Sequence, residues 1–290
     1  MARGVDNSHL LARKNGMNFK FVLLALALLA WDFTGNGSSA HFAVADEGVE
    51  HQAESGSVVS RPKVIIFDVN ETLLDLAPLK TSVGKALGGR EDLLPLWFST
   101  MLHYSLVETL SGEYHSFGEI GTAALMMVAK TQGIDLEYDQ AKAAIVTPLR
   151  SLPPHSDVVA GLQTLKSEGY QIVSLTNSSN VGVETQFKNA GLTEFFEKRY
   201  SVEAIKKYKP HPDTYRMVLA DLDVKPEDVL MVAAHAWDLA GAKNVGLQTA
   251  FITRPGKALY PNVAKPDYVV NDLQELVHVL RQADLSAKNE

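Results

Sequence analysis

Short apolar runs alternate with amphipathic stretches along most of the chain after residue 62. The apolar runs predict buried β-strands at 63–68, 172–175, 229–233 and 249–252. The amphipathic stretches predict helices at 158–167, 181–190, 212–222, 238–245 and 272–281. Strands that alternate with helices in this way are typical of an α/β fold, in which a Rossmann-like parallel sheet carries helices on both faces.

One long interval lacks any strand pattern. Between residues 79 and 146 the apolar positions recur at helical spacing in three successive stretches. Because this interval comes soon after the first strand, we predict that it forms an all-helical cap domain. The cap, 79–146, is then inserted into a core domain built from 62–78 and 147–285.

The first 45 residues have the pattern of a secretory signal peptide. Basic residues precede the apolar run 21–31, and small and polar residues then lead to Ala43-Val44-Ala45. We therefore predict cleavage after Ala45, a periplasmic or secreted protein, and a polar linker at 46–61. Translation starts at either Met1 or Met17. The apolar run is short for a membrane span, but an uncleaved anchor stays an open alternative.

Composition bears on partners more than on fold. The 290 residues carry a formal net charge of −7, which argues against a nucleic-acid partner. An anionic substrate would need a local positive potential, since the global charge repels it. Cysteine is absent, so a disulfide framework, thiol chemistry and a lipid-anchored N-terminus are excluded. After signal cleavage we expect no association with a membrane.

The segment Phe67-Asp68-Val69-Asn70-Glu71-Thr72 carries the most informative chemistry. It ends a predicted strand, and open α/β sheets build their sites at the carboxyl ends of strands. An aspartate there can act as a covalent nucleophile. A second aspartate two residues later would supply a metal ligand and a proton carrier for phosphate esters, but Asn70 stands at that position. The segment therefore favours a different electrophile.

Three further segments follow in order along the chain. They are Val173-Ser174-Leu175-Thr176-Asn177, then Tyr208-Lys209-Pro210 with Tyr215 six residues after the lysine, and Val232-Ala233-Ala234-His235-Ala236-Trp237-Asp238. With the Asp68 segment they resemble the haloacid dehalogenase superfamily, and more closely its metal-independent branch, the type II (S)-2-haloacid dehalogenases. The resemblance covers about Lys63 to Leu280.

Two places depart from that branch. Phe98 stands where the branch typically has a cap arginine that binds the departing halide and the substrate. Ala233 and His235 stand where it often has a serine and an asparagine. Both departures bear on the identity of the substrate more than on the covalent mechanism.

The segments and the resemblance together imply a set of site residues. Catalytic roles fall to Asp68 as nucleophile, Thr72, Lys209, His235 and Asp238. Thr72 would orient the Asp68 carboxylate, and Lys209 would lower its pKa and keep it ionised. An imidazole that titrates near neutrality suits a base that activates water, so His235, Asp238 and Lys209 are candidates to guide the water.

Substrate contacts are expected from neutral donors and apolar walls. The backbone N–H groups after Asp68 form a candidate anion nest, and the polar side chains after the second strand can hold a carboxylate or a halide. The predicted substrate-binding residues are Val69, Asn70, Phe98, Thr176, Asn177, Tyr215 and Trp237. The resemblance implies neither a metal ion nor a cofactor.

Each of these residues also has a purely structural interpretation. Asp, Thr and Asn at strand ends often only satisfy turns, and Asp238 is also suited to cap the helix after it. Lys209 lies among other lysines that are usually solvated, and Tyr215 can be a packing residue. The cap aromatic residues at helical spacing, Phe98 included, are more often core than cleft.

The resemblance implies a hydrolase that converts small 2-haloacids into 2-hydroxy acids. Asp68 displaces the halide and becomes an ester, which water then hydrolyses. The alternatives are a phosphatase of the same fold that requires Mg²⁺, with Asp238 as one ligand, and a catalytically silent exported binding protein. The expected partner is a small halogenated carboxylic acid, and a homodimer formed through the cap is plausible by resemblance only.

Overall fold

The computed structural model describes residues 61–287, all within one compact unit, Ser55–Glu290. The predicted signal peptide, and all of the predicted linker except Arg61, lie outside the described residues. Among the helices that are described, none is long and apolar enough to cross a membrane.

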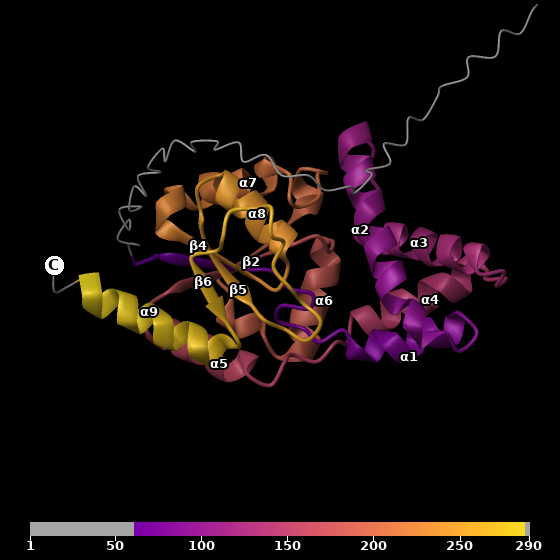
Figure 1. The fold of residues 1–290 in the computed structure, drawn as a ribbon, viewed down its shortest axis with the longest axis horizontal. Coiled ribbons are helices and arrows are strands. Elements are labelled where there is room, and N and C mark those ends of the chain that lie inside the picture. Colours follow the sequence, from indigo (N-terminus) through magenta and orange to yellow (C-terminus); the bar gives the residue numbers. More distant parts are fainter. Residues whose placement is uncertain (1–60, 288–290) are drawn as a thin grey trace, which may run out of the picture. The chain divides into compact units, whose positions relative to one another are not determined.

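A parallel six-stranded sheet in the order β3-β2-β1-β4-β5-β6 forms the centre of the structure (Figure 1). Its strands are β1 (Val64–Phe67), β2 (Gln171–Thr176), β3 (Lys198–Ser201), β4 (Val229–Ala233), β5 (Gln248–Ile252) and β6 (Tyr268–Val270). Ile66 of β1 pairs with Val173 of β2 on one side and with Met231 of β4 on the other. The central strands are apolar runs because helices cover both of their faces, which leaves no solvated side.

The helices of the core lie on opposite faces of this sheet. Helices α5 (Val158–Ser167) and α9 (Leu273–Ala287) pack together on one face, and α7 (Pro212–Leu222) and α8 (Ala236–Asn244) pack together on the other (Figure 1). Helix α6 (Asn180–Ala190) follows β2. The predicted fold class, a parallel sheet with helices on both faces, is confirmed.

Between β1 and α5, the helices α1 (Ala77–Ala86), α2 (Leu94–Ser111), α3 (Phe117–Thr131) and α4 (Tyr138–Leu149) pack on one another. Trp97 is buried between α2 and α3, and its Nε1 donates to the carbonyl of Gly121 at 2.8 Å. The sequence pattern separated three helical stretches here, and the structure adds α1 before them. The all-helical insertion after the first strand is present, while its exact domain boundaries stay a prediction.

The pattern missed the two edge strands, β3 and β6. Strand β3 is Lys-Arg-Tyr-Ser with only its last residue buried, and β6 has only three residues. An edge strand pairs on one side only, so it needs no continuous apolar run that a sequence pattern can detect. Short 3₁₀ helices, also missed, connect other elements at Glu91–Leu93, Thr193–Phe195, Val202–Ala204 and Pro226–Asp228.

The strand order places the ends of β1 and β4 at the centre of the sheet. From β1 the chain continues on one side to β2 and β3, and it then crosses to the other side for β4, β5 and β6. Such a reversal leaves a crevice outside the carboxyl ends of the strands on either side of it. Asp68 follows β1 at this point, and His235 comes two residues after β4.

Candidate active site

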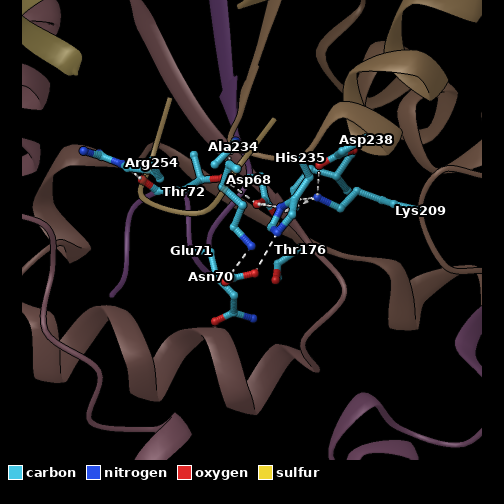
Figure 2. Close-up of polar contacts among 12 residues, drawn as sticks. Asp68, Asn70, Glu71, Thr72, Thr176, Lys209, Ala234, His235, Asp238 and Arg254 are labelled. Atoms are coloured by element: carbon cyan, nitrogen blue, oxygen red, sulfur yellow. Dashed lines mark hydrogen bonds and ion pairs between the residues drawn. The ribbon is translucent and has the colours of Figure 1, made fainter. Parts of the chain in front are cut away.

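Asp68 accepts three hydrogen bonds from three different parts of the chain (Figure 2). Lys209 Nζ lies 2.8 Å from its Oδ1, whereas Thr72 Oγ1 and His235 Nδ1 lie 2.6 Å and 3.1 Å from its Oδ2. The Asp68 residue is only 5% exposed. The structure thus gathers four of the five predicted catalytic residues around one carboxylate.

The fifth, Asp238, lies behind Lys209. Its Oδ2 is 2.6 Å from Lys209 Nζ, which also donates to the carbonyl of Leu175 at 2.9 Å. The Tyr215 hydroxyl donates to Asp238 Oδ1 at 2.6 Å. The Lys209 and Asp238 side chains are 1% and 0% exposed. The interpretation of Lys209 as a solvated surface residue is therefore wrong. The interpretation of Asp238 as a helix N-cap is also wrong, because the N-cap of α8 is His235.

Helix α8 approaches this side of the site closely because Gly241 has no side chain. A Cβ at that position would lie 2.5 Å from Pro210 Cβ and 2.7 Å from the Tyr215 hydroxyl oxygen. Real Cβ atoms do not come that near to other heavy atoms. Gly241 therefore allows Asp238, in the first turn of α8, to reach Lys209.

His235 forms the other side of the site, and it contacts a residue that the sequence analysis did not select. Its Nε2 lies 2.9 Å from Glu71 Oε2, and Lys257 Nζ lies 2.6 Å from Glu71 Oε1. The imidazole stacks on two aromatic rings, with centroids 6.2 Å away for Phe98 and 5.1 Å away for Trp237. Lys257 Nζ is 5.7 Å from the centre of the Phe98 ring.

Thr72 is held so that its hydroxyl proton points at Asp68. The backbone N–H of Ala234 donates to Thr72 Oγ1 at 2.9 Å, which leaves the hydroxyl hydrogen for Asp68 Oδ2. Arg254 Nε donates to the carbonyl of Thr72 at 3.1 Å and is itself fixed by two bonds to Asp157, at 2.7 Å and 3.0 Å. Arg254 thereby anchors the loop that carries Thr72.

The surroundings of Asp68 favour its charged form. Burial opposes ionisation, but the charge of Lys209 and the hydrogen bond from His235 outweigh burial and hold the pKa of Asp68 well below its usual range. Burial likewise opposes the charge on Lys209, yet Asp238 and Asp68 raise its pKa above the ordinary value. The Asp68 carboxylate is therefore ionised at neutral pH, and Lys209 contributes to this as expected from the sequence.

His235 departs from the prediction. Burial favours the neutral imidazole, but the hydrogen bonds and charges of Asp68 and Glu71 raise the pKa of His235 to about 9. The expected titration near neutrality is therefore wrong for this structure. His235 is an imidazolium at pH 7, with both ring nitrogens donating, and in that form it cannot accept a proton from water.

The polar residues predicted to bind substrate are partly engaged by the protein. Asn70 donates through Nδ2 to Ser178 Oγ at 3.1 Å and accepts at Oδ1 from Gln186 Nε2 at 2.8 Å. Thr176 Oγ1 accepts from the backbone N–H of Ser178, and Asn177 Oδ1 accepts from that of Lys209. Within residues 61–287, no partner is found for the amide N–H groups of Asn177, which stay available as donors.

The backbone after Asp68 and two aromatic rings, Phe98 and Trp237, complete the predicted set. No hydrogen bond from the backbone N–H of Val69 is found within the described range, while its carbonyl accepts from Leu73 and Leu74. Phe98 is half-buried against the core and also stacks on His235, so its ring belongs to both the core and the site. Trp237 also stacks on His235, and its ring centre lies 5.9 Å from Lys209 Nζ.

Three residues of the site were missed: Glu71, Lys257 and Arg254. Glu71 lies inside the Asp68 segment, so its position was a usable signal. Lys257 and Arg254 lie after β5, where no pattern marks them. Among the described residues, no group of three or more His, Asp or Glu side chains is arranged to hold a metal ion.

A cavity of about 280 Å³ lies next to the contacts of Asn70. Its lining includes Ser178 and Gln186, which bind the Asn70 side chain, together with residues of α3, α4 and α6. Asp68 is not part of the lining.

Comparison with known proteins gives a consistent result. A family model described as haloacid dehalogenase-like hydrolase matches residues 62–246. The chain is 32% identical over 219 residues to (S)-2-haloacid dehalogenase 1 of Pseudomonas sp. (strain CBS-3), covering 75% of this chain and 96% of that protein. Haloacetate dehalogenase H-2 of Moraxella sp. (strain B) is 29% identical over 75% of this chain and 97% of its own length.

Solved structures agree with the sequence matches. An L-2-haloacid dehalogenase from Xanthobacter autotrophicus has a TM-score of 0.69 and 28% identity, covering 76% of this chain and 98% of that chain. A structure of L-2-haloacid dehalogenase from the same organism with chloropropionic acid covalently bound has a TM-score of 0.67 and 27% identity, with the same coverage.

Proposed function

The chain belongs to the haloacid dehalogenase-like hydrolases, and from this membership we propose that it hydrolyses the carbon–halogen bond of small 2-haloacids. The products are a 2-hydroxy acid and a halide ion, and the intermediate is an ester on Asp68. The observation that carries the proposal is the Asp68 carboxylate, which is buried, ionised and bonded on both oxygens by Lys209, Thr72 and His235.

The two oxygens of Asp68 are not equivalent. Oδ2 accepts from two donors, Thr72 and His235, whereas Oδ1 accepts only from Lys209. Oδ1 therefore keeps the more available lone pair and is the attacking atom. Its displacement of the halide from the opposite side of the carbon inverts that carbon and forms the ester. In a site closed to water, the carboxylate is poorly hydrated and more reactive.

Water then attacks the carbonyl carbon of the ester. Asp238 is the remaining buried carboxylate on the Lys209 side, and burial raises its pKa, which makes it a better base than an ordinary aspartate. Asp238 takes a proton from the water and returns it to the departing hydroxy acid. The free Asp68 carboxylate is restored at the end of the cycle.

The amide of Asn70 supports a reaction without a metal ion or a second acid at this position. Its side chain is bonded to Ser178 and Gln186, and it has no titratable proton to give to a leaving phosphate ester. Glu71 and Asp238 each contact a cation of the protein, so their charges are already balanced. We therefore assign no metal and no cofactor to the reaction.

The test is halide release by the purified protein from 2-chloro- and 2-bromo-acids in the presence of EDTA, with the Asp68→Asn variant alongside. We expect release that survives EDTA and is abolished in the variant. A single turnover in H₂¹⁸O should place the label on Asp68, because water attacks the carbon of its carboxyl group. Halide release by Asp68→Asn at the wild-type rate would contradict the aspartyl ester.

The same assays separate the alternative functions. Mg²⁺-dependent hydrolysis of a phosphate ester without halide release would identify a phosphatase. Binding of haloacids without turnover would identify a silent binding protein, and Phe98 in place of a cap arginine would then be its cause.

We also propose that the protein is exported, since basic residues, an apolar run and Ala43-Val44-Ala45 follow one another at its N-terminus. The N-terminal sequence of the mature protein is expected to begin at Asp46. A homodimer stays a prediction by resemblance, and the sedimentation velocity of the purified protein tests it.

A further inference from the structure

The arrangement around His235 decides how this residue can act. The hydrolysis of an aspartyl ester turns the oxygen that did not attack the substrate into a carbonyl oxygen and then into an oxyanion. If Oδ1 is the attacking atom, that oxygen is Oδ2. It is the atom to which Thr72 and His235 already donate, at 2.6 Å and 3.1 Å.

We propose that the His235 imidazolium and the Thr72 hydroxyl form an oxyanion hole for hydrolysis of the Asp68 ester, and that Glu71, anchored by Lys257, is the positioning residue that keeps His235 doubly protonated. This inference rests on the proposed function, because it requires the ester. It reverses the role that the sequence indicated for His235, which was that of a base.

Glu71 matters most when the ester has formed. Asp68 then has no charge, and one of the two carboxylates that stabilise the imidazolium is lost. Glu71 still contacts Nε2 at 2.9 Å. Asp238, from α8, bonds to Lys209 and Tyr215. Lys209 and Lys257 pair with the two carboxylates that contact the imidazole, and the rings of Phe98 and Trp237 stack on it.

Burial and pairing support the same assignment. His235 is 7% exposed, and the pKa of about 9 in the free protein reflects both carboxylates. Burial alone raises the pKa of Glu71, but His235 and Lys257 together lower it, so Glu71 is a stable anion at neutral pH. The negative charge of Glu71, which stabilises the His235 imidazolium, is therefore present throughout the cycle.

The backbone of Glu71 is a second, independent sign of a specific role. Its φ angle is 64°, in the left-handed region that side-chain-bearing residues rarely adopt. Such conformations cluster at functional sites, where the surrounding structure enforces them. Here the N–H of Glu71 donates to the carbonyl of Leu74 at 2.8 Å, and this tight loop directs the carboxylate between His235 and Lys257.

The step balances without any added reagent. Water attacks Asp68 Cγ and gives one proton to Asp238, while the electrons of the Cγ–Oδ2 double bond move onto Oδ2. His235 Nδ1–H and Thr72 Oγ1–H donate to that oxyanion and keep their protons. The double bond re-forms, the bond from Cγ to the substrate oxygen breaks, and the departing alkoxide takes the proton from Asp238. Asp68 loses its carboxyl proton to solvent.

The first test separates ester formation from ester hydrolysis by rapid mixing of enzyme with 2-bromopropionate. In His235→Ala, we expect one halide per site to be released in a burst, followed by turnover about 10²- to 10³-fold slower than in the wild type, because one oxyanion donor is missing. Mass spectrometry should find the ester on Asp68. His235→Asn keeps a neutral donor and should hydrolyse the ester faster than His235→Ala.

The second test is the pH profile of ester hydrolysis. An imidazolium donor predicts that the rate falls at alkaline pH, whereas a histidine base predicts that it rises with pH. Glu71→Gln removes the anion beside Nε2 and should move the alkaline limb to lower pH. Lys257→Met leaves Glu71 unbalanced and should move the same limb to higher pH. A merely structural role for Glu71 would leave the position of this limb unchanged.

The outcomes distinguish the two proposals. If the wild type releases no halide, the proposed function fails and this inference fails with it. If the wild type turns over but His235→Ala hydrolyses its ester at the wild-type rate, or the rate rises with pH through the alkaline range, the oxyanion hole alone is overturned. If the fall in the rate of ester hydrolysis at alkaline pH is absent in His235→Asn, the oxyanion hole is supported.

Discussion

Two charge networks flank the Asp68 carboxylate, and they are built from similar groups in different surroundings. On one side, Lys209 and Asp238 are 1% and 0% exposed and are sealed by α8. On the other side, Glu71 and Lys257 are each 19% exposed and pair next to Phe98 of the cap. His235 links this second network to the same carboxylate.

The difference in exposure gives the two networks different roles. A dry pair interacts strongly and is insensitive to salt, so the Lys209 network supplies a constant charge that keeps Asp68 ionised. A partly wet network is weaker and responds to pH and salt, so the charge on His235 can be tuned by its neighbours. The Asp68 carboxylate thus contacts one cation of constant charge, Lys209, and one whose charge depends on pH and salt, His235.

The largest effect is expected from Lys209→Met. The substitution leaves the charges of Asp68 and Asp238 buried without their cation, which costs about 3–5 kcal/mol in the free energy of unfolding. Urea unfolding measures this change. Lys207→Met is the matched control on the same loop, since Lys207 pairs with Asp213 at 2.6 Å but is 40% exposed. The control should lose less than about 1 kcal/mol, and equal losses would contradict the contrast in burial.

The second effect is a loss of stability at alkaline pH. The pKa of His235 rises from an ordinary value of 6.5 to about 9 on folding, so its stabilisation is fully present below pH 6.5 and disappears as the pH rises through about 9. The shift corresponds to roughly 3 kcal/mol. Unfolding free energies measured from pH 6 to pH 10 should therefore fall more steeply in the wild type than in His235→Asn. Parallel curves would mean that His235 is not charged in the folded protein.

A smaller effect is expected from Tyr215→Phe. The hydroxyl of Tyr215 donates to the buried carboxylate of Asp238 at 2.6 Å, and loss of a bond to a charged group costs about 1.5–3 kcal/mol. Tyr200→Phe is the control, because the Tyr200 hydroxyl donates to Asp221 at the same distance but on the surface. Urea unfolding should give a clearly smaller loss for the control.

The smallest effect is expected from Lys257→Met, measured as stability in low and high salt. Its pair with Glu71 is partly exposed, so the loss should be below about 1 kcal/mol and should shrink further in 1 M NaCl. The loss in Lys209→Met should be nearly independent of salt. If the loss of stability in Lys257→Met did not depend on salt, the Glu71–Lys257 pair would be as shielded from solvent as the Lys209 network.

The sequence predicted most of the fold because helices and buried strands have strong periods. The predicted bounds of α5, α7 and β4 agree with the structure, since each is a regular element bounded by a turn or a proline. The edge strands β3 and β6 were missed because they are polar or very short. The parallel direction of the central strands was predicted from their alternation with helices.

Part of the site was predictable for a related reason. Asp68 and Thr176 adjoin the carboxyl ends of adjacent parallel strands, and His235 lies just beyond a third, so these side chains converge on one edge of the sheet. Lys209 and Asp238 were found through their place in ordered segments. Glu71 was overlooked because a glutamate in a loop is usually solvated, and only its left-handed backbone turns it toward His235.

The sequence by itself determined the α/β core, the helical insertion, the family and the place of the candidate nucleophile, because apolar periodicity and ordered strand-end segments are local features of the chain. The tertiary structure alone decided the protonation of His235 and the partners Lys257 and Arg254. A pKa depends on burial and on charges within a few ångströms. Glu71 contacts His235 and Lys257 contacts Glu71 from loops after two different strands. No local sequence pattern shows that these loops lie close together.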